Sequence, residues 1–400
     1  MVMESILSIE QRNNVLLTMA RLVNDQQNDI LKANEKDIKG YDRHDIAMYD
    51  RLKVDQEKIL GMVASLEQLA AQKDPVGIER FHFKHDNGLD IYNKTASFGT
   101  IMIIYESRPD VTIEAGGIAF KSGNKILLKG GKESLNSNLA IVDLWHEALK
   151  QNKVSKDWVT YLNYDREQTR AYLKHPNQKI DLIIPRGGEK LIAFVKEHAT
   201  CPVIVSGRGN NFVYVAQEAD QMKAMQIILN AKTDKISACN ALDKVLINRD
   251  LPGYEDFVNR LIQNLKQHKV QVLGSHRMES FEGVESVSEE EVWYEEFLDF
   301  KILIGDVASN EEAVAMINKY GGGHSASIIT ENETEADTFM SSIDAAAVYH
   351  NASTRFTDGF QFGLGGELAI STDKLHQRGP IGLQHLVTNK WYVYGDGQIR

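Results

Sequence analysis

The stretch from Thr100 to Lys129, TIMIIYESRPDVTIEAGGIAFKSGNKILLK, determines the predicted fold class. Two short apolar runs, TIMIIY and KILLK, flank a segment whose apolar residues recur at helical spacing. Strands that are apolar on both sides, without polar alternation, are typical of a parallel sheet covered by helices. We therefore expect a strand, a crossover helix and a second parallel strand.

The same alternation extends along most of the chain. Residues 1 to about 75 carry apolar residues at three- and four-residue spacing, which predicts helices. Short apolar runs alternate with helical segments from Thr100 to about Ala219, and a second such series starts near Cys239. Because 400 residues exceed what one core usually supports, we expect two α/β domains, the first a doubly wound parallel sheet. The predicted strands include WVTYL, IDLIIP, PVIVSG, ALDKVLIN, FKILIGD and SASIIT.

A β-hairpin is predicted before the first parallel strand. Apolar and polar residues alternate on both sides of Asp86-Asn87-Gly88, a turn sequence typical of hairpins. A lone two-stranded hairpin is barely stable in water, so we expect it to pack on another element or another subunit. The strand-like C-terminal sequence NKWYVYGDGQIR is a candidate to pair with it.

Composition and charge exclude several classes of function. The formal net charge of −11 argues against nucleic acid as a partner, because phosphate binding needs a basic stripe. The start lacks signal-peptide features and no run of about 18 apolar residues occurs, so we expect a cytoplasmic protein without membrane spans. The chain has two cysteines and neither CxxC nor HExxH, so we expect no disulfide framework and no metal site.

Cys239 is the candidate nucleophile. It lies in the polar stretch NAKTDKISACNALDK, between an apolar helix and an apolar strand. Lys232 and Lys235 would favour its thiolate, which is the reactive form. The alternative is a small buried apolar residue, the usual role of a free cysteine. Cys201, which precedes an apolar run, fits that alternative well.

Two glycine-containing loops are candidate phosphate sites. Lys129 and Lys132 flank Gly130-Gly131 after a strand, and Arg186-Gly187-Gly188 lies between a strand and a helix. Glycines admit a close backbone approach, and free N–H groups at a helix N-terminus attract a pyrophosphate. Ordinary solvated turns are the alternative at both places. No GxGxxG occurs, so a standard Rossmann fingerprint is absent.

Three residues are candidates for binding an anionic substrate. Arg108 directly precedes Pro109, a residue suited to begin a helix, and a buried arginine there would need an anionic partner. His324 and Arg355 lie in loops rich in Gly, Ser, Thr and Asn, which commonly line sites. Ordinary solvated loop residues are the alternative for each.

Eight motifs in order resemble one known family. They are IYESRPDVTIEAGGIAFKSGN, LLKGGKES, LIIPRGGEKLI, GGGHSASI, NASTRFTDG, FGLGGELAIST, RGPIGL and YVYGDGQIR. Together they resemble the γ-glutamyl phosphate reductases of the aldehyde dehydrogenase superfamily, over about residues 95 to 400. The resemblance implies NADPH-dependent reduction of L-glutamyl 5-phosphate to glutamate 5-semialdehyde in proline biosynthesis. It also implies a homo-oligomer, with glutamate 5-kinase as a further partner.

The resemblance also implies roles for individual residues. Cys239 would form the thioester, and its backbone N–H would stabilise the oxyanion. The stretch PVIVSGRGNN lacks the carboxylate with which hydrolytic relatives activate water, as expected where phosphate is the leaving group. The stretch KISA before Cys239 departs from the family pattern. The implied cofactor-binding residues are Lys129 (adenosine ribose), Lys132 (2′-phosphate), Arg186, Gly187 and Gly188 (pyrophosphate) and Glu296 (nicotinamide ribose), and the implied substrate-binding residues are Arg108, Arg355 and His324.

The resemblance further implies a division of the chain. Residues 1–80 and 97–230 would form the cofactor-binding domain, residues 81–96 and 386–400 an oligomerisation β-flap, and residues 231–385 the catalytic domain. Two rival functions remain open. One is another acyl-phosphate or CoA-thioester reductase of the superfamily, and the other is a catalytically silent relative that binds nucleotide or scaffolds a partner.

Overall fold

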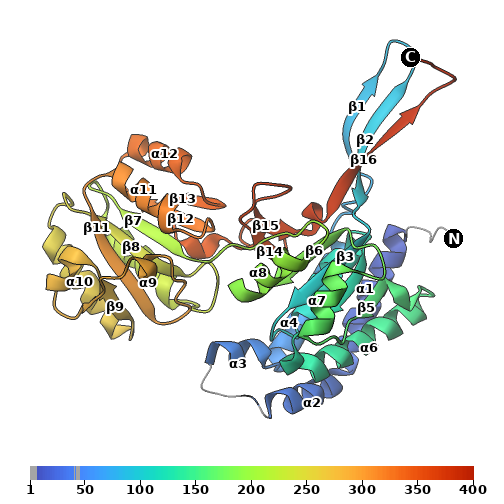
Figure 1. Ribbon diagram of the computed structural model, residues 1–400, viewed down its shortest axis with the longest axis horizontal. Helices are drawn as coiled ribbons and strands as arrows, with labels where there is room; N and C mark the ends of the chain where they lie inside the picture. Colours follow the sequence, from blue (N-terminus) through green and yellow to red (C-terminus); the bar gives the residue numbers. More distant parts are fainter. Residues whose placement is uncertain (1–6, 40, 42–45) are drawn as a thin grey trace. The chain divides into compact units, whose positions relative to one another are not determined.

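The computed structural model describes residues 7–39, 41 and 46–400, which form two compact units (Figure 1). Unit 1 comprises Met1–Val205, Gly363–Ala369 and Ile381–Arg400, and unit 2 comprises Ser206–Phe362 and Ile370–Pro380. The first boundary thus lies 25 residues before the predicted one at 230/231. The reason is that strand β7 (Asn211–Val215) pairs with two strands of unit 2, β8 (Leu242–Asn248) and β12 (Ser325–Ile329).

Unit 1 begins with the predicted helices and continues with a parallel sheet. The strand order β5-β4-β3-β6 is that of a doubly wound fold, and all three pairings are parallel. Because the order reverses at β3, the carboxyl ends of β3 and β6 form the place where such sheets bind ligands. The strands are β3 (Thr100–Tyr105), β4 (Lys125–Lys129), β5 (Val159–Tyr161) and β6 (Leu182–Arg186). The helices are α1 (Ile9–Asp25), α2 (Gln27–Ile38), α3 (Ile46–Leu52), α4 (Gln56–Ala71), α5 (Val111–Lys121), α6 (Leu135–Gln151), α7 (Arg166–Lys174) and α8 (Glu189–His198).

Both faces of this sheet are buried, as the apolar strands predicted. Ile101 and Ile103 of β3 belong to the core that contains residues of α1, α4, α5 and α6. Met102 and Ile104, which point the other way, belong to a second core with residues of α7 and α8. The predicted strand PVIVSG is not a strand here, because only Val203 bridges to Ile183 of the sheet.

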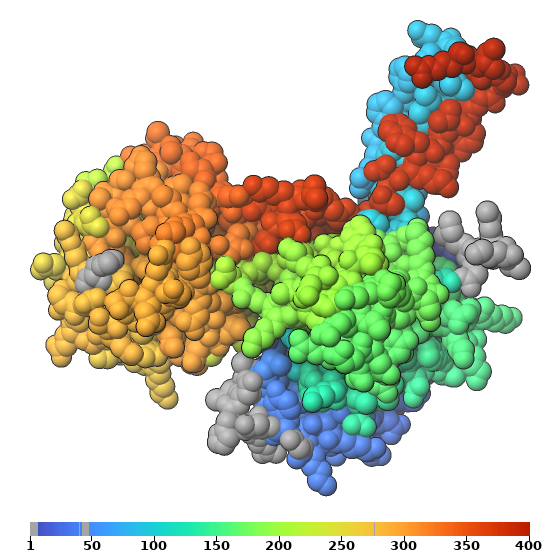
Figure 2. All heavy atoms as spheres, viewed as in Figure 1, coloured from blue at the N-terminus to red at the C-terminus, as the bar shows by residue number. Residues whose placement is uncertain are grey.

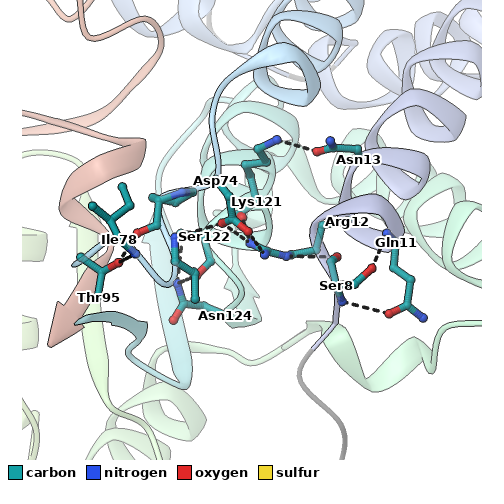
Figure 3. Close-up of polar contacts among 12 residues, drawn as sticks. Ser8, Gln11, Arg12, Asn13, Asp74, Ile78, Thr95, Lys121, Ser122 and Asn124 are labelled. Carbon is teal, nitrogen blue, oxygen red and sulfur yellow. Dashed lines mark hydrogen bonds and ion pairs between the residues drawn. The ribbon is translucent and has the colours of Figure 1, made fainter. Parts of the chain in front are cut away.

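A buried polar cluster fixes α1 to the rest of unit 1 (Figure 3). The Arg12 side chain is 2% exposed, and its Nη2 lies 2.7 Å from Oδ2 of Asp74. Nη1 of Arg12 also donates to the carbonyl of Lys121, at the end of α5. Lys121 Nζ in turn donates to the side chain of Asn13 and to the Ala70 carbonyl. The cluster thereby joins α1, α4 and α5.

Three antiparallel strands form an arm of unit 1, which we call the flap (Figure 2). They are β1 (Glu79–Lys84), β2 (Asp90–Ser97) and β16 (Val387–Tyr394), in the order β1-β2-β16. The predicted turn is confirmed, with Gly88 at φ 92°, and β16 pairs with β2 along its whole length. The pairing of the C-terminal strand with the hairpin is therefore confirmed, whereas the oligomeric role of the flap stays a prediction.

Unit 2 contains a seven-stranded parallel sheet in the order β10-β9-β11-β8-β7-β12-β13. Within the described residues, no helix of either unit is long and apolar enough to cross a bilayer. The remaining strands of this sheet are β8 (Leu242–Asn248), β9 (Gln271–Gly274), β10 (Glu285–Ser286), β11 (Lys301–Val307), β12 (Ser325–Ile329) and β13 (Ala347–His350). The helices are α9 (Gln221–Thr233), α10 (Tyr254–Gln267), α11 (Asn310–Tyr320) and α12 (Glu333–Ser342), and β14 (Glu367–Ser371) pairs with β15 (Gly379–Gly382) in a separate sheet.

Candidate functional site

The carboxyl edge of the unit 1 sheet gathers the predicted cofactor residues Lys129, Arg186, Gly187 and Gly188. Lys129 ends β4 and Arg186 ends β6, while Gly188 is the N-cap of α8. The start of α8 suits a pyrophosphate, because it presents backbone N–H groups next to Gly187 and Gly188. The predicted cofactor residues of unit 1 therefore share one edge of one sheet.

Glu106, which sequence reasoning did not assign, already lies at the start of α8. Its Oε2 accepts a hydrogen bond of 3.0 Å from the Gly188 N–H. A Cβ at position 187 would lie 2.3 Å from the same oxygen, so glycine is required there for the carboxylate to approach. An internal anion thus occupies the place expected for the pyrophosphate.

The two predicted lysines of the second loop differ in environment. Lys129 Nζ donates to the Gly130 carbonyl at 2.7 Å, and burial is the main cause that lowers the pKa of this lysine. Lys132 is exposed in the 3₁₀ turn Lys132–Ser134. Glu133 in the same turn accepts from the N–H and hydroxyl of Ser107, at 2.9 and 2.7 Å. Ser107 has a φ of 42°, so this acceptor holds a strained turn after β3.

Arg108 lies near a carboxyl group within its own unit. Burial, followed by the Asp110 carboxylate, raises the pKa of Glu114 to about 7, whereas Arg186 and Arg108 act in the opposite direction. The anionic partner expected for Arg108 is thus supplied in part by Glu114. The sequence analysis did not identify Glu114; a glutamate inside the apolar helix VTIEAGGIAF is the signal that would have indicated it.

Cys239 of unit 2 is exposed, in a turn at the amino end of β8. Asn211 holds this turn, because its Nδ2 lies 2.8 Å from the Cys239 carbonyl and 2.7 Å from the Ala241 carbonyl. Nδ2 of Asn240 donates to the carbonyls of Arg355 and Thr357, at 3.1 and 2.9 Å. The thiol is therefore presented on a fixed backbone, and these two asparagines were not identified from the sequence.

Lys232 does not have the role that was predicted from its position near Cys239. Its side chain is fully buried, and its Nζ lies 3.1 Å from Oδ1 of the buried Asp243. Burial is the main cause that lowers the pKa of Lys232. The lysine is thus engaged in an internal ion pair, while Lys235 is exposed.

Arg355 is paired with a carboxylate of the segment that leads to Cys239. Its Nε and Nη2 both donate to Oδ2 of Asp234, at 3.1 and 3.0 Å. The Arg355 side chain is 17% exposed and that of Asp234 is 55% exposed. An incoming carboxylate or phosphate would therefore compete with Asp234 for this guanidinium.

His324 is buried and neutral. Burial lowers its pKa to about 4, and its Nδ1 lies 2.8 Å from the Ser325 hydroxyl. Its Nε2 has no hydrogen-bond partner among the described residues. The hydroxyls of Ser325, Thr357 and Tyr349 follow in a chain with spacings of 2.6 and 2.7 Å. The backbone carbonyl of Thr357 accepts from the Asn240 amide, so Thr357 is bonded both to this chain and to the residue next to Cys239.

Gly209 brings Glu296 close to the Cys239 turn. A Cβ at this glycine would lie 2.2 Å from the Cys239 carbonyl oxygen and 2.6 Å from Oε1 of Glu296. The absence of a side chain therefore lets the carboxylate and the turn converge. Unit 2 thus brings together Cys239, Glu296 and Arg355, and His324 is linked to their neighbour Asn240 through Ser325 and Thr357. Among the residues of the described ranges, no group of three His, Cys, Asp or Glu is placed to hold a metal ion.

Comparisons with known proteins agree with one another. The aldehyde dehydrogenase family profile matches residues 5–279 and 288–391. The chain is 40% identical to a γ-glutamyl phosphate reductase of Clostridium perfringens over 99% of this chain and 95% of that protein. It is 42% identical to one of Clostridium botulinum, over 98% and 94% of the two chains. The crystal structure of the γ-glutamyl phosphate reductase of Thermotoga maritima superposes with a TM-score of 0.92, at 39% identity and over 98% and 95% of the chains.

Proposed function

The chain belongs to the aldehyde dehydrogenase family, and from this premise we propose that it reduces L-glutamyl 5-phosphate to glutamate 5-semialdehyde and phosphate with NADPH. This reaction is the second step of proline biosynthesis from glutamate. The observation that carries the proposal is the exposed Cys239 on a turn held by Asn211, in a chain about 40% identical to γ-glutamyl phosphate reductases over nearly its full length.

The proposed chemistry begins at Sγ of Cys239. The thiolate attacks the acyl carbon, so that an S–C bond forms and the C–O bond to phosphate breaks, with phosphate leaving as the anion. NADPH, when bound, supplies a hydride to the thioester carbon. The Cys239 backbone N–H is proposed to stabilise the negative oxygen, which then re-forms the carbonyl as the C–S bond breaks. The aldehyde leaves and the thiolate is regenerated.

The remaining candidate residues take binding roles in this proposal. Arg108, Arg355 and His324 are proposed to bind the substrate, and Arg355 would exchange Asp234 for a substrate anion. His324 is neutral, so it would act as a hydrogen-bonding group and not as a cation. The proposed cofactor ligands are Lys129, Lys132, Arg186, Gly187 and Gly188 at the unit 1 edge and Glu296 in unit 2. A cation at position 132 is the reason to favour NADPH over NADH, because it suits a 2′-phosphate.

The reverse reaction tests nucleophile, substrate and leaving group together. Purified protein is incubated with glutamate 5-semialdehyde, NADP⁺ and phosphate, and NADPH formation is followed by absorbance. We expect reduction of NADP⁺ that depends on both semialdehyde and phosphate, with NAD⁺ a poorer acceptor. Reduction that needs CoA in place of phosphate, or that proceeds with simple aldehydes alone, would overturn the proposal in favour of a different acyl reductase.

A further inference from the structure

Two consecutive residues of β8, Asp243 and Lys244, hold the backbone on the two sides of Glu296. Lys244 Nζ donates to the Glu295 carbonyl at 2.7 Å, and Oδ2 of Asp243 accepts from the Phe297 N–H at 3.1 Å. The Glu295 carbonyl and the Phe297 N–H belong to the two peptide groups that flank the Cα of Glu296. Both hydrogen bonds therefore limit rotation of the backbone from which the Glu296 side chain projects.

The surroundings of Lys244 are unusual for a residue that only fills space. Its side chain is fully buried, and its Nζ lies 3.8 Å from the centre of the Phe297 ring. The nearby carboxylate of Asp243 is already paired with Lys232. Burial is the main cause that lowers the pKa of Lys244 to about 7, which shows that a cation is costly at this position. An apolar residue would fill the strand without that cost, so stability alone does not explain the lysine.

We propose that Asp243 and Lys244 form a clamp that positions the Glu296 carboxylate for the hydroxyls of the nicotinamide ribose. The clamp acts through the backbone, so both are positioning residues and neither needs to contact the cofactor. Gly209 provides the space into which the held carboxylate projects, with Oε1 2.6 Å from where a Cβ would be. This inference rests on the role of Glu296 in the proposed function.

The test compares two substitutions at Lys244 and two ligands. Lys244→Met keeps the shape of the side chain and removes the donor, whereas Lys244→Gln keeps an N–H donor. Dissociation constants are measured by titration calorimetry for NADP⁺ and for 2′,5′-ADP, which lacks the nicotinamide ribose. We expect Lys244→Met to weaken NADP⁺ binding about tenfold, the value of one lost hydrogen bond, and to leave 2′,5′-ADP binding unchanged. Lys244→Gln should bind NADP⁺ within about threefold of the unsubstituted protein.

Steady-state kinetics and a second pair of variants complete the test. Lys244→Met should raise KM for NADP⁺ more than KM for the semialdehyde. At the other side of the clamp, Asp243→Ala should weaken NADP⁺ binding, while Asp243→Asn, which retains an acceptor oxygen, should not. Lys121→Met is the matched control, because it removes a different fully buried lysine, one that lies in unit 1. It should change the free energy of unfolding without changing the dissociation constant for NADP⁺.

Two results would overturn the clamp. One is NADP⁺ binding by folded Lys244→Met equal to that of the unsubstituted protein, and the other is an equal loss for NADP⁺ and 2′,5′-ADP, which would indicate a general structural defect. If the unsubstituted protein binds NADP⁺ but does not reduce it with semialdehyde and phosphate, the proposed function is contradicted. The dissociation constants of the Lys244 and Asp243 variants then still test the clamp.

Discussion

Cys239 and Cys201 are the two cysteines of the chain, and their surroundings predict opposite responses to substitution. Cys239 is exposed on its turn, whereas Cys201 is half-buried and burial raises the pKa of its thiol. We expect Cys239→Ser to lower kcat of the phosphate-dependent reaction by about 10³-fold or more, since removal of a nucleophile typically has at least that effect. Cys201→Ser should retain activity, and both variants should show the circular dichroism spectrum of the unsubstituted protein. Substantial activity in folded Cys239→Ser would refute the thioester.

His324 predicts a pH dependence of stability. Its folded-state pKa, about 4, lies below the ordinary value of 6.5, because burial disfavours the charged ring. The unfolded chain therefore binds a proton that the folded chain does not, and the stability contribution is lost as the pH falls from 6.5 towards 4. The free-energy difference between the unsubstituted protein and His324→Gln should shrink by about 2 kcal/mol from pH 7 to pH 5. Urea unfolding at both pH values measures it, and a constant difference would contradict a buried neutral histidine.

Glu106 predicts a gain of affinity on substitution. Its carboxylate accepts from the Gly188 N–H at the place proposed for a pyrophosphate, so the two anions compete. Glu106→Gln keeps an acceptor oxygen and removes the charge. We expect its NADP⁺ dissociation constant to fall several-fold, which corresponds to about 1 kcal/mol for one pair of like charges about 4 Å apart in water. Glu197→Gln is the control, because it removes a carboxylate that is 77% exposed near the other end of α8, and the affinity should not change. Weaker binding by Glu106→Gln would show that the carboxylate assists the cofactor.

Sequence reasoning located the candidate nucleophile but not its support. A cysteine among polar residues indicated exposure, and Cys239 is exposed. Lys232 was misjudged because its partner, Asp243, lies 11 residues along the chain on a strand that pairs with β7 and β11. Glu296 and Gly209 are separated by even more residues along the chain, and no local periodicity predicts that they lie close together. Residue type thus indicated the chemistry, while tertiary pairing decided which neighbours act on it.

The Arg12–Asp74 ion pair contributes to holding helix α1 in unit 1. Arg12 donates to Asp74 and to the Lys121 carbonyl from a fully enclosed position. Arg12→Met should lower the free energy of unfolding by about 3 kcal/mol, because it leaves a partly buried carboxylate and a carbonyl without their donor. Urea unfolding followed by tryptophan fluorescence measures the loss. The double variant Arg12→Met with Asp74→Asn should recover part of it, and additive losses would contradict the coupling of the two residues.

Strand and helix positions were largely predictable because apolar runs and helical spacing are local signals. TIMIIY, KILLK and ALDKVLIN all became strands of parallel sheets. PVIVSG did not, although it is equally apolar, because only Val203 reaches the sheet. Strand β7 resembles the strands of unit 1 in composition, so the sequence offered no mark of the unit boundary before it. Pairing partners, and not composition, determine the sheet to which a strand belongs.

The flap predicts the state of assembly. Phe81 of β1 and Trp391 of β16 are 49% and 56% exposed on the two strands that flank β2, with ring centres 5.7 Å apart. We propose that these rings contact another copy of the chain, because exposed aromatic clusters on a sheet favour association. The double variant Phe81→Ser with Trp391→Ser should have the mass of a monomer by light scattering, whereas the unsubstituted protein should have the mass of an oligomer. Met222→Ser removes an apolar side chain elsewhere that is 68% exposed, and it should not alter the mass. An unchanged mass in the double variant would exclude these rings as contacts.

The pairing of β16 with β2 also determines when the flap is completed during synthesis. Nδ2 of Asn93 donates to Oδ1 of Asn389 across these strands, although the two residues are 296 positions apart. While a ribosome makes the intervening chain, β2 has an open edge on the side that β16 will cover, and open edges recruit other strands. Nascent chains should therefore be most prone to aggregation just before residues 387–394 emerge, and chaperone binding should concentrate in that interval.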